Sequence, residues 1–400
     1  MHWLRNVRLP VARACRHGQH RVWRVGLADD GTIARLEPTP SGSAVAGDDW
    51  GGDWLSPLGV DLQINGGLGL AFPELTPADA PRLDQLLQHL WADGVEAISP
   101  TLVTCGAAPL RQALTVLAQA RARHQPGRCR LLGAHLEGPF LAAHRRGAHP
   151  AEHLAAPDAA ALAERIGGFR GGPGWDQPAD IALMTLAPEL PGATAVITAL
   201  RQSGIVVCLG HSDADDSQAA ASFAAGVTML THTFNAMAGL GHRQPGPVAA
   251  ALLHGEVALG LIADGVHVAP SMAVLLQRLA PAQVVLVSDA LAPYGLAEGR
   301  HRWDERALIV NNGTCRLDDG TLAGVTLPLL EGAIRLADWS GEPGWAIAAA
   351  TVQPRRVLGD HRSIEALLSG RPLAHCLRWH LGPKQLTWRR ADPSQDKVAP

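Results

Sequence analysis

Residues 205–232 read IVVCLGHSDADDSQAAASFAAGVTMLTH. This stretch contains two strand-sized apolar runs, Ile205–Leu209 and Thr228–Thr231, separated by a helical pattern. A histidine lies just past the end of each run, His211 after the first and His232 after the second. The pattern predicts a strand–helix–strand unit that places an imidazole at the carboxyl end of each strand.

The same alternation continues over most of the chain from Leu55 onward. Continuous apolar strands that alternate with helices favour a buried parallel sheet, and eight such units favour an α/β fold of the (β/α)8 TIM-like barrel type. A doubly wound open sheet is the alternative, but the strand count and the absence of a GxGxxG fingerprint favour the barrel. The strand candidates are Leu58–Ile64, Val95–Pro100, Leu131–Leu136, Ile181–Leu186, Ile205–Leu209, Thr228–Thr231, Ala258–Ala263 and Val284–Ser288. The helical patterns include Ala80–Ala92, Pro109–Arg123, Ala193–Ser203, Ser217–Ala225 and Ser271–Leu279.

The two ends of the chain lack the alternation of apolar strands and helices that predicts the barrel. Short β-like pieces and turn signals in residues 1–54 indicate the first part of a small β domain. We expect the barrel to occupy residues 55–350 and residues 351–400 to complete the small domain, with strands within Leu373–Arg389. The tail from Asp392 to Pro400 is expected to be flexible.

Composition excludes several classes of function. The formal net charge of -3 produces no field that would favour nucleic acid or an anionic membrane. No apolar stretch is long enough to cross a bilayer, and the arginine-rich N-terminus lacks the apolar core of a signal peptide. The six cysteines show no CxxC or regular spacing, which indicates reduced thiols in a cytoplasmic protein.

Three residues at predicted strand ends have the chemistry of metal ligands. Glu137, His211 and His232 would converge at the mouth of a barrel, and one carboxylate with two imidazoles leaves a coordination position open for water. Each histidine alone would more often be structural, and Glu137 could instead pair with Arg145 or Arg146. Their joint placement favours a catalytic divalent metal.

Asp289 ends another predicted strand, Val284–Ser288. A carboxylate beside a metal site can take a proton from water and later deliver it to a leaving group. The alternative is a helix N-cap, but the residues after Asp289 do not resemble the start of a helix.

His149, His267 and Arg243 lie on predicted loops at the same rim, where binding residues concentrate. Arginine suits phosphate recognition, although any one of these residues could also be an ordinary solvated loop residue. The sequence contains neither a nucleophile elbow nor a P-loop.

Taken in order, these segments resemble the N-acetylglucosamine-6-phosphate deacetylase family of the amidohydrolase superfamily. The resemblance covers about residues 55–330, and the ordered series is far more specific than any single motif. The matching segments are PLGVDLQINGG at 57–67, GAHLEGPF at 133–140, RGAHP at 146–150, LGHSDA at 209–214, THTFNAM at 231–237, ADGVH at 263–267, VSDA at 287–290 and GTLAG at 320–324.

The resemblance implies hydrolysis of the acetamide of N-acetyl-D-glucosamine 6-phosphate by a metal-dependent homodimer. It implies Glu137, His211 and His232 as metal ligands, and Asp289 as the general base that later protonates the amine. The further roles it implies are polarisation of the carbonyl by His149, a sugar contact by His267, phosphate contacts by Asn235, Ala236 and Arg243, and substrate contacts by Gln63 and Asn65.

The sequence also departs from the superfamily and family patterns. The first strand carries Gln63-Ile64-Asn65 where many members have HxH, which argues for one metal per chain rather than two. We expect zinc first, with iron, manganese or cobalt as alternatives. Residues Val325–Leu329 and the C-terminal stretch also differ from the usual family pattern, which leaves the local sugar contacts and the shape of the small domain open.

Two other functions fit parts of this pattern. One is a different amidohydrolase, a cyclic amidase or aminohydrolase acting on an unphosphorylated substrate, which would need the metal and Asp289 but not Arg243. The other is a non-catalytic sugar-phosphate-binding protein, which would have no use for Asp289 beside a metal.

Overall fold

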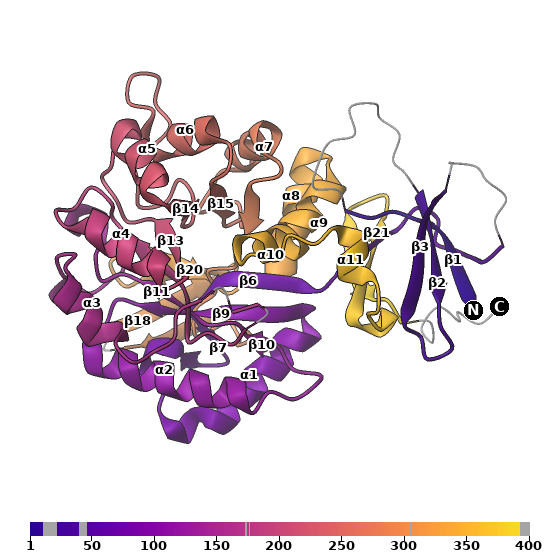
Figure 1. Ribbon diagram of the computed structural model, residues 1–400, viewed down its shortest axis with the longest axis horizontal. Helices are drawn as coiled ribbons and strands as arrows, with labels where there is room; N and C mark the ends of the chain where they lie inside the picture. Colours follow the sequence, from indigo (N-terminus) through magenta and orange to yellow (C-terminus); the bar gives the residue numbers. More distant parts are fainter. Residues whose placement is uncertain (11–21, 40–45, 173, 176, 305, 393–400) are drawn as a thin grey trace.

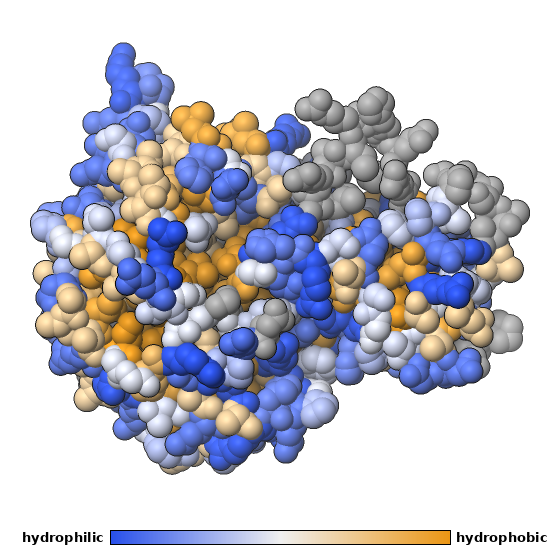
Figure 2. Space-filling view, in the orientation of Figure 1, coloured by the Kyte–Doolittle hydropathy of each residue, from blue (hydrophilic) through white to orange (hydrophobic). Residues whose placement is uncertain are grey.

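A computed structural model describes residues 1–10, 22–39, 46–172, 174–175, 177–304 and 306–392. Its main part is a parallel barrel surrounded by helices, with a small β domain beside it (Figure 1). The predicted fold class is therefore confirmed. In the space-filling view the small domain forms a lobe next to the barrel, and hydrophilic and apolar residues are interspersed over the barrel surface (Figure 2).

The barrel strands lie in the order β6-β9-β11-β12-β13-β14-β15-β16, and each pair of neighbours in this order is parallel. Backbone hydrogen bonds from Asp289 N to Gln63 O (2.8 Å) and from Asn65 N to Ala290 O (2.7 Å) join the carboxyl ends of the first and last strands. The rim is therefore closed where β6 meets the segment after β16. The strands are β6 (Gly59–Ile64), β9 (Val95–Val103), β11 (Ala134–Glu137), β12 (Ile181–Leu186), β13 (Val206–Leu209), β14 (Val227–Leu230), β15 (Ala258–Leu261) and β16 (Val284–Leu286).

These strands are buried because helices cover their outer faces and side chains fill the barrel interior. The helices of the barrel are α1 (Ala80–Ala92), α2 (Ala107–Ala122), α3 (Ala159–Ile166), α4 (Ala193–Gln202), α5 (Asp216–Ala225), α6 (Gly246–His254), α7 (Pro270–Leu279), α8 (Leu329–Ser340), α9 (Pro343–Thr351) and α10 (Gln353–Val357). None of the helices in the described part of the chain is long and apolar enough to cross a bilayer.

Most sequence-predicted elements recur with ends shifted by one to three residues. The predicted strand Leu131–Leu136 is an exception, because it is divided into β10 (Arg130–Leu131) and β11. Gly133 lies between the two with φ 138°, a conformation that residues with a side chain rarely adopt. Beyond it the chain pairs with β9 again, one residue out of register, and also with β12.

The small domain combines segments from both ends of the chain, as predicted. One sheet has the order β3-β2-β1-β4 and the other the order β22-β21-β5. Leu4, Val25, Ile33, Leu55 and Cys376 share its apolar core. Its elements are β1 (His2–Val7), β2 (Val22–Leu27), β3 (Ile33–Thr39), β4 (Asp48–Asp49), β5 (Trp54–Pro57), α11 (Ile364–Leu368), β21 (Cys376–Leu381) and β22 (Leu386–Arg390).

Domain boundaries near residues 54 and 350 stay predictions. The expected flexible tail falls almost entirely on residues 393–400, outside the described residues. The described cysteines are all free, namely Cys105, Cys129, Cys208, Cys315 and Cys376.

The sequence did not lead us to expect an antiparallel sheet inserted between β16 and α8. It consists of β17 (Gly299–Trp303), β18 (Arg306–Asn311), β19 (Thr314–Leu317) and β20 (Leu322–Val325). Asn312 and Gly313, both with positive φ, form the turn between β18 and β19. An Asn-Gly pair between two extended segments is a hairpin signal that could have revealed this sheet.

A buried ion-pair cluster links the base of the barrel to the C-terminal segment. Glu96, on β9, accepts hydrogen bonds from Arg355 Nη2 (2.8 Å) and Arg371 Nη1 (2.7 Å). Burial alone would raise the pKa of Glu96, but the two guanidinium groups outweigh it and lower this pKa to about 2. Arg355 is fully buried and also donates to Leu58 O, so it depends on Glu96 for charge compensation.

We expect Glu96→Ala to destabilise the fold by about 3–5 kcal/mol, because it leaves the buried Arg355 charge without its partner. Denaturant-induced unfolding at neutral pH would measure the loss. Asp318→Ala, which breaks an exposed ion pair with Arg300, is the control and should have a much smaller effect.

This contribution should also depend on pH. The pKa of Glu96 is lowered on folding from 4.5 to about 2, so its stabilisation is present above pH 4.5 and lost as the pH falls through this interval. The stability difference between the native protein and Glu96→Ala should therefore shrink as the pH is lowered toward 2. A difference that stays constant would contradict this account.

Candidate active site

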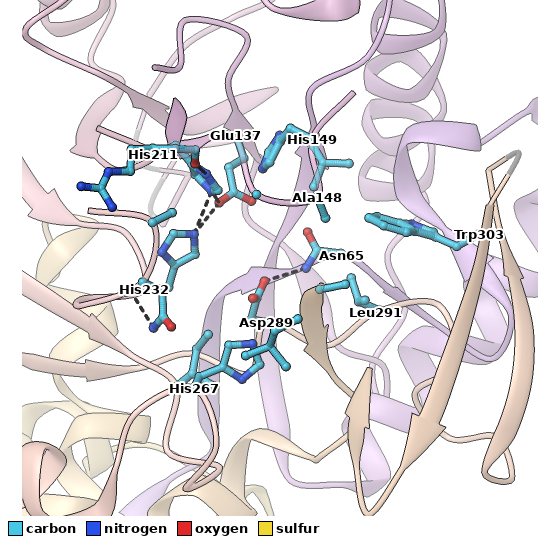
Figure 3. A pocket seen from close by; sticks show the side chains of 18 of the residues that line it. Asn65, Glu137, Ala148, His149, His211, His232, His267, Asp289, Leu291 and Trp303 are labelled. Atoms are coloured by element: carbon cyan, nitrogen blue, oxygen red, sulfur yellow. Dashed lines mark hydrogen bonds and ion pairs between the residues drawn. The ribbon is translucent and has the colours of Figure 1, made fainter. Parts of the chain in front are cut away.

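The predicted site residues meet at one end of the barrel. Glu137 ends β11, while His211 and His232 follow β13 and β14 by two residues each. Asp289 lies just beyond β16, and Asn65 directly follows β6. Because the strands are parallel, their carboxyl ends share one rim, and the side chains surround a pocket there (Figure 3).

Three candidate metal ligands lie within one small cluster. Glu137 Oε1 is 3.1 Å from both His211 Nε2 and His232 Nε2, and the two imidazole nitrogens are 2.9 Å apart. Each residue offers a ligand atom, these atoms all lie within 4.8 Å of one another, and all three residues are buried.

The donor pattern around His211 fits a cation at this point. His211 Nδ1 is 2.7 Å from the backbone carbonyl of Arg145, which can only accept a hydrogen bond, so Nδ1 carries the proton. In a neutral imidazole Nε2 then has a free lone pair, and it faces the carboxylate oxygen of Glu137. Two acceptors held face to face in a buried site are repulsive unless a positive charge lies between them. A carbonyl that orients a histidine in this way is typical of metal-binding histidines.

Asp289 lies next to this cluster. Asn65 Nδ2 donates to Asp289 Oδ1 at 2.8 Å, and Gln63 Nε2 lies 3.3 Å from both Asp289 Oδ1 and Glu137 Oε1. Gln63 therefore bridges the two carboxylates and fixes their spacing. Burial raises the pKa of Asp289 to about 6, and the charge of Glu137 adds to this effect.

His149 reaches the pocket from the loop after β11, on the side of Glu137 and His211 (Figure 3). His149 Nδ1 lies 2.9 Å from Thr104 Oγ1 and 3.3 Å from the backbone nitrogen of Thr104, and these contacts orient the ring. Burial, followed by the nearby His211, lowers the pKa of His149 to about 3, so the ring is neutral. A neutral ring with its proton on Nε2 can donate it to a substrate oxygen.

His267 lines the opposite part of the pocket, on the loop after β15. Its Nδ1 lies 2.7 Å from Asp264 Oδ2, and Asp264 also accepts from the backbone N–H groups of Val266 and His267. This arrangement fixes the orientation of the ring and leaves Nε2 for a ligand. Asn235 and Ala236 line the pocket nearby.

The backbone is strained at several site residues. His211 (φ 49), His232 (φ 28), Ala236 (φ 50) and Asp289 (φ 51) all adopt the left-handed region that favours glycine. Such residues cost about 1–3 kcal/mol each and tend to cluster at functional sites. His211, His232 and Asp289 adopt this conformation two or three residues past a strand end, where their side chains line the pocket.

The site decides between the alternative interpretations of two residues. Arg145 pairs with Asp213 at 2.6 Å, and Arg146 donates to the carbonyl of His149 at 3.1 Å, whereas Glu137 contacts the histidines. Asp289 is followed by a strand-like bridge from Ala290 to Val325 and not by a helix, so the N-cap interpretation is wrong.

Arg243 is the predicted site residue that lies apart from the others. It is exposed on the loop before α6 and lines a separate shallow hollow formed by residues 239–244. Gln63 does not line the pocket, and its side chain forms hydrogen bonds with Glu137 and Asp289.

The pocket has a volume of about 340 Å³. The sequence did not reveal the apolar wall of this pocket, which includes Val103, Leu291, Trp303, Leu322 and Ala323. Three of these come from the inserted sheet, so the unexpected hairpins complete the pocket. The Val325–Leu329 departure begins beyond these pocket-lining residues.

The chain is similar to known deacetylases over most of its length. It is 34% identical over 344 residues to the N-acetylgalactosamine-6-phosphate deacetylase of Escherichia coli O157:H7, covering 86% of this chain and 87% of that one. It is 35% identical over 323 residues to the N-acetylglucosamine-6-phosphate deacetylase of Bos taurus, covering 78% and 76% of the two chains.

Solved structures agree with this similarity. A mutant N-acetyl-D-glucosamine-6-phosphate deacetylase from Mycobacterium smegmatis, in complex with N-acetyl-D-glucosamine-6-phosphate, superposes with a TM-score of 0.75 at 27% identity, covering 90% of each chain. No protein-family model matches the chain.

Proposed function

The chain belongs to the N-acetylglucosamine-6-phosphate deacetylase family, and from this premise we propose that it hydrolyses the acetamide of N-acetyl-D-glucosamine 6-phosphate. The products are D-glucosamine 6-phosphate and acetate, in amino-sugar metabolism. The observation that carries the proposal is the bridge by Gln63, which holds Asp289 beside the Glu137, His211 and His232 cluster.

The ligand set suits one divalent metal, and we propose zinc, with iron, manganese or cobalt as alternatives. When bound, such an ion supplies a Lewis acid that polarises the acetamide and lowers the pKa of water toward neutrality. Gln63 and Asn65 replace the histidines that would serve a second metal, which supports one ion per chain.

The protein's own residues then have three tasks. Asp289 takes a proton from the attacking water on its carboxylate and delivers it to the departing nitrogen, without which the C–N bond does not break. His149 donates from Nε2 to the carbonyl oxygen as negative charge develops there. The hydrogen bond from Asn65 orients the Asp289 carboxylate for both proton transfers.

Substrate binding is proposed for the polar side of the pocket. His267 would contact sugar hydroxyls, while Asn235, Ala236 and Arg243 would hold the phosphate. A phosphate contact far from the reacting bond positions the acetamide for attack.

The assay that tests this function measures acetate release from N-acetyl-D-glucosamine 6-phosphate, with metal content determined on the same sample. Turnover with about one metal per chain supports both the proposed reaction and the proposed single metal ion. Hydrolysis of N-acetyl-D-glucosamine without phosphate at equal efficiency would favour a different amidohydrolase. Metal with no turnover of any acetylated sugar would favour a binding protein.

The Escherichia coli relative gives a specific reason to test a second substrate, since its name specifies N-acetylgalactosamine 6-phosphate. The two sugars differ only in configuration at C4, away from the acetamide. The ratio of kcat/KM for the two phosphates decides which one this protein prefers.

We also propose a cytoplasmic homodimer. The free cysteines favour a reducing compartment. Support for the dimer comes from Arg243, which is exposed and lies apart from the pocket, a placement that suits a phosphate contact made across a subunit interface.

Arg243→Ala should raise KM for the phosphorylated sugar by about 10²-fold, because a charged hydrogen bond to phosphate contributes about 1.5–3 kcal/mol. The KM for the unphosphorylated sugar should not change. His242→Ala, on the same loop, is the matched control. Equal effects on both sugars would remove the phosphate assignment.

Mixing the inactive Asp289→Asn protein with Arg243→Ala, at a substrate concentration far below the KM of Arg243→Ala, tests whether Arg243 acts across the interface. A dimer of Asp289→Asn with Arg243→Ala has one site with an intact Asp289 and an intact Arg243 from the partner. Recovery of activity on mixing supports the interface role. Absence of recovery, with mixed dimers verified, would place Arg243 at the site of its own subunit or outside catalysis.

A further inference from the structure

The pocket has a polar and an apolar side. Ala148, Leu291 and Trp303 lie together on one side, while His232 lies on the opposite side (Figure 3). Val103 adds to the apolar side. Trp303 is 7% exposed and packs in a small apolar cluster with Leu291. Nothing in the proposed proton transfers uses this wall.

The chemistry of the amide indicates which group the wall receives. The carbonyl carbon carries an oxygen, a nitrogen and an alkyl group. Oxygen must face His149 and the metal cluster, and the sugar on nitrogen must face the polar side near His267. The alkyl group remains, and burying it against apolar side chains is favourable.

Trp303 also separates this pocket from a second one. The indole and Val103 line both cavities, and the second has a volume of about 560 Å³. It extends to the start of α2, where Gly106 and Ala108 contribute to its wall. Removing the indole would therefore join two cavities.

Arg306, itself held by Asp304, packs against the Trp303 indole. The guanidinium carbon of Arg306 lies 4.5 Å from the centroid of the Trp303 ring, and Arg306 Nη1 donates to Ala148 O at 2.7 Å. Asp304 forms hydrogen bonds with the same guanidinium. Arg306 thus ties the position of Trp303 to the loop that carries His149.

We propose that Trp303 limits the length of the acyl group that the enzyme removes, and that the cavity behind it can receive the longer acyl chains of N-acylated amino-sugar phosphates. This inference rests on the proposed function. The reaction is unchanged: water adds to the carbonyl carbon, the C–N bond breaks, and the amine takes the proton while the carboxylic acid leaves.

The experiment compares N-acetyl, N-propanoyl and N-butanoyl D-glucosamine 6-phosphate. One methylene in a fitted apolar pocket changes kcat/KM by about 10–200-fold, so the native protein should prefer acetyl over butanoyl by at least about 10²-fold. Trp303→Ala should raise the ratio of butanoyl to acetyl kcat/KM by at least about 10-fold. Trp303→Phe should fall between the two. An unchanged ratio in a folded Trp303→Ala protein would overturn the proposal.

A double variant tests whether the second cavity holds the chain. Ala108→Leu added to Trp303→Ala narrows that cavity far from the reacting bond. The double variant should lose the gain in kcat/KM for the butanoyl substrate. Its kcat/KM for the acetyl substrate should equal that of Trp303→Ala. A gain that persists would place the longer chain elsewhere.

Binding provides a measurement that does not depend on turnover. Calorimetry of the three ligands with Asp289→Asn, alone and combined with Trp303→Ala, should show butanoyl gaining affinity relative to acetyl when the indole is removed. If the native protein hydrolyses none of the ligands but this shift occurs, the proposed function fails and the acyl-length role stands. No shift in binding and no shift in turnover would reject the role of Trp303.

Discussion

Replacing Asp289 with asparagine should lower kcat for N-acetyl-D-glucosamine 6-phosphate by about 10³-fold, within the range that a positioned general acid or base contributes. An amide cannot take a proton from water or return it to the amine. Its oxygen can still accept the hydrogen bond from Asn65 Nδ2 that the carboxylate accepts at 2.8 Å. Metal content and substrate affinity should therefore change little, and steady-state kinetics with metal analysis measure all three.

Asp61→Asn is the matched control for this variant. Asp61 is a buried aspartate whose carboxylate accepts from the backbone N–H groups of Gln63 and Ser288, both at 3.2 Å, and it does not line the pocket. An amide oxygen can accept the same bonds, so activity should stay within a few-fold of the native level. A kcat near the native value for Asp289→Asn would show that another group transfers the proton.

The barrel was predictable because its strands carry an unambiguous signal. Strands buried on both faces carry mostly apolar residues, as in the run IALMTL of β12. This is why β12 was predicted with its observed bounds, Ile181–Leu186. The inserted sheet was missed because its strands are half-exposed and alternate weakly, for example in the partly exposed run Gly299–Trp303.

The same contrast holds for the site. The sequence predicts a common rim for Glu137, His211, His232 and Asp289, because each of them ends or follows a predicted strand. The structure places the four residues together there. Their chemical roles stay predictions. The orientation of His211 depends on the backbone carbonyl of Arg145, and every residue has such a carbonyl. A contact of this kind has no sequence signature.

The place of Arg243 on the rim can be predicted from the sequence, whereas a contact across a subunit interface has no sequence signature. The position of Arg243 in the sequence, three residues before α6, suggests a rim loop, and the structure agrees. A pocket that needs a group from a second subunit looks incomplete from either chain alone. The mixed-variant experiment is therefore more informative about Arg243 than the fold of the single chain.

Removal of one metal ligand should have the other large effect. His211→Ala should reduce metal affinity by more than about 100-fold, since even changes to groups that only orient a ligand cost 10–100-fold. The protein should be purified with little bound metal and with activity near background. Elemental analysis measures the amount of bound metal. The rise in Tm on adding metal measures binding to the folded protein, because a ligand that binds the folded state stabilises it.

His149→Ala is the control that separates metal loss from loss of catalysis. The rings of His149 and His211 are neighbours, with centroids 4.4 Å apart, and His149 is not among the three residues that converge on the candidate metal position. His149→Ala should keep the metal and the metal-induced rise in Tm while kcat falls by about 10²-fold, because a donor to the developing oxyanion is lost. If His149→Ala also lost its metal, His149 would have to be counted among the ligands. If His211→Ala kept a full complement of metal, the cluster of Glu137, His211 and His232 would not be the metal site.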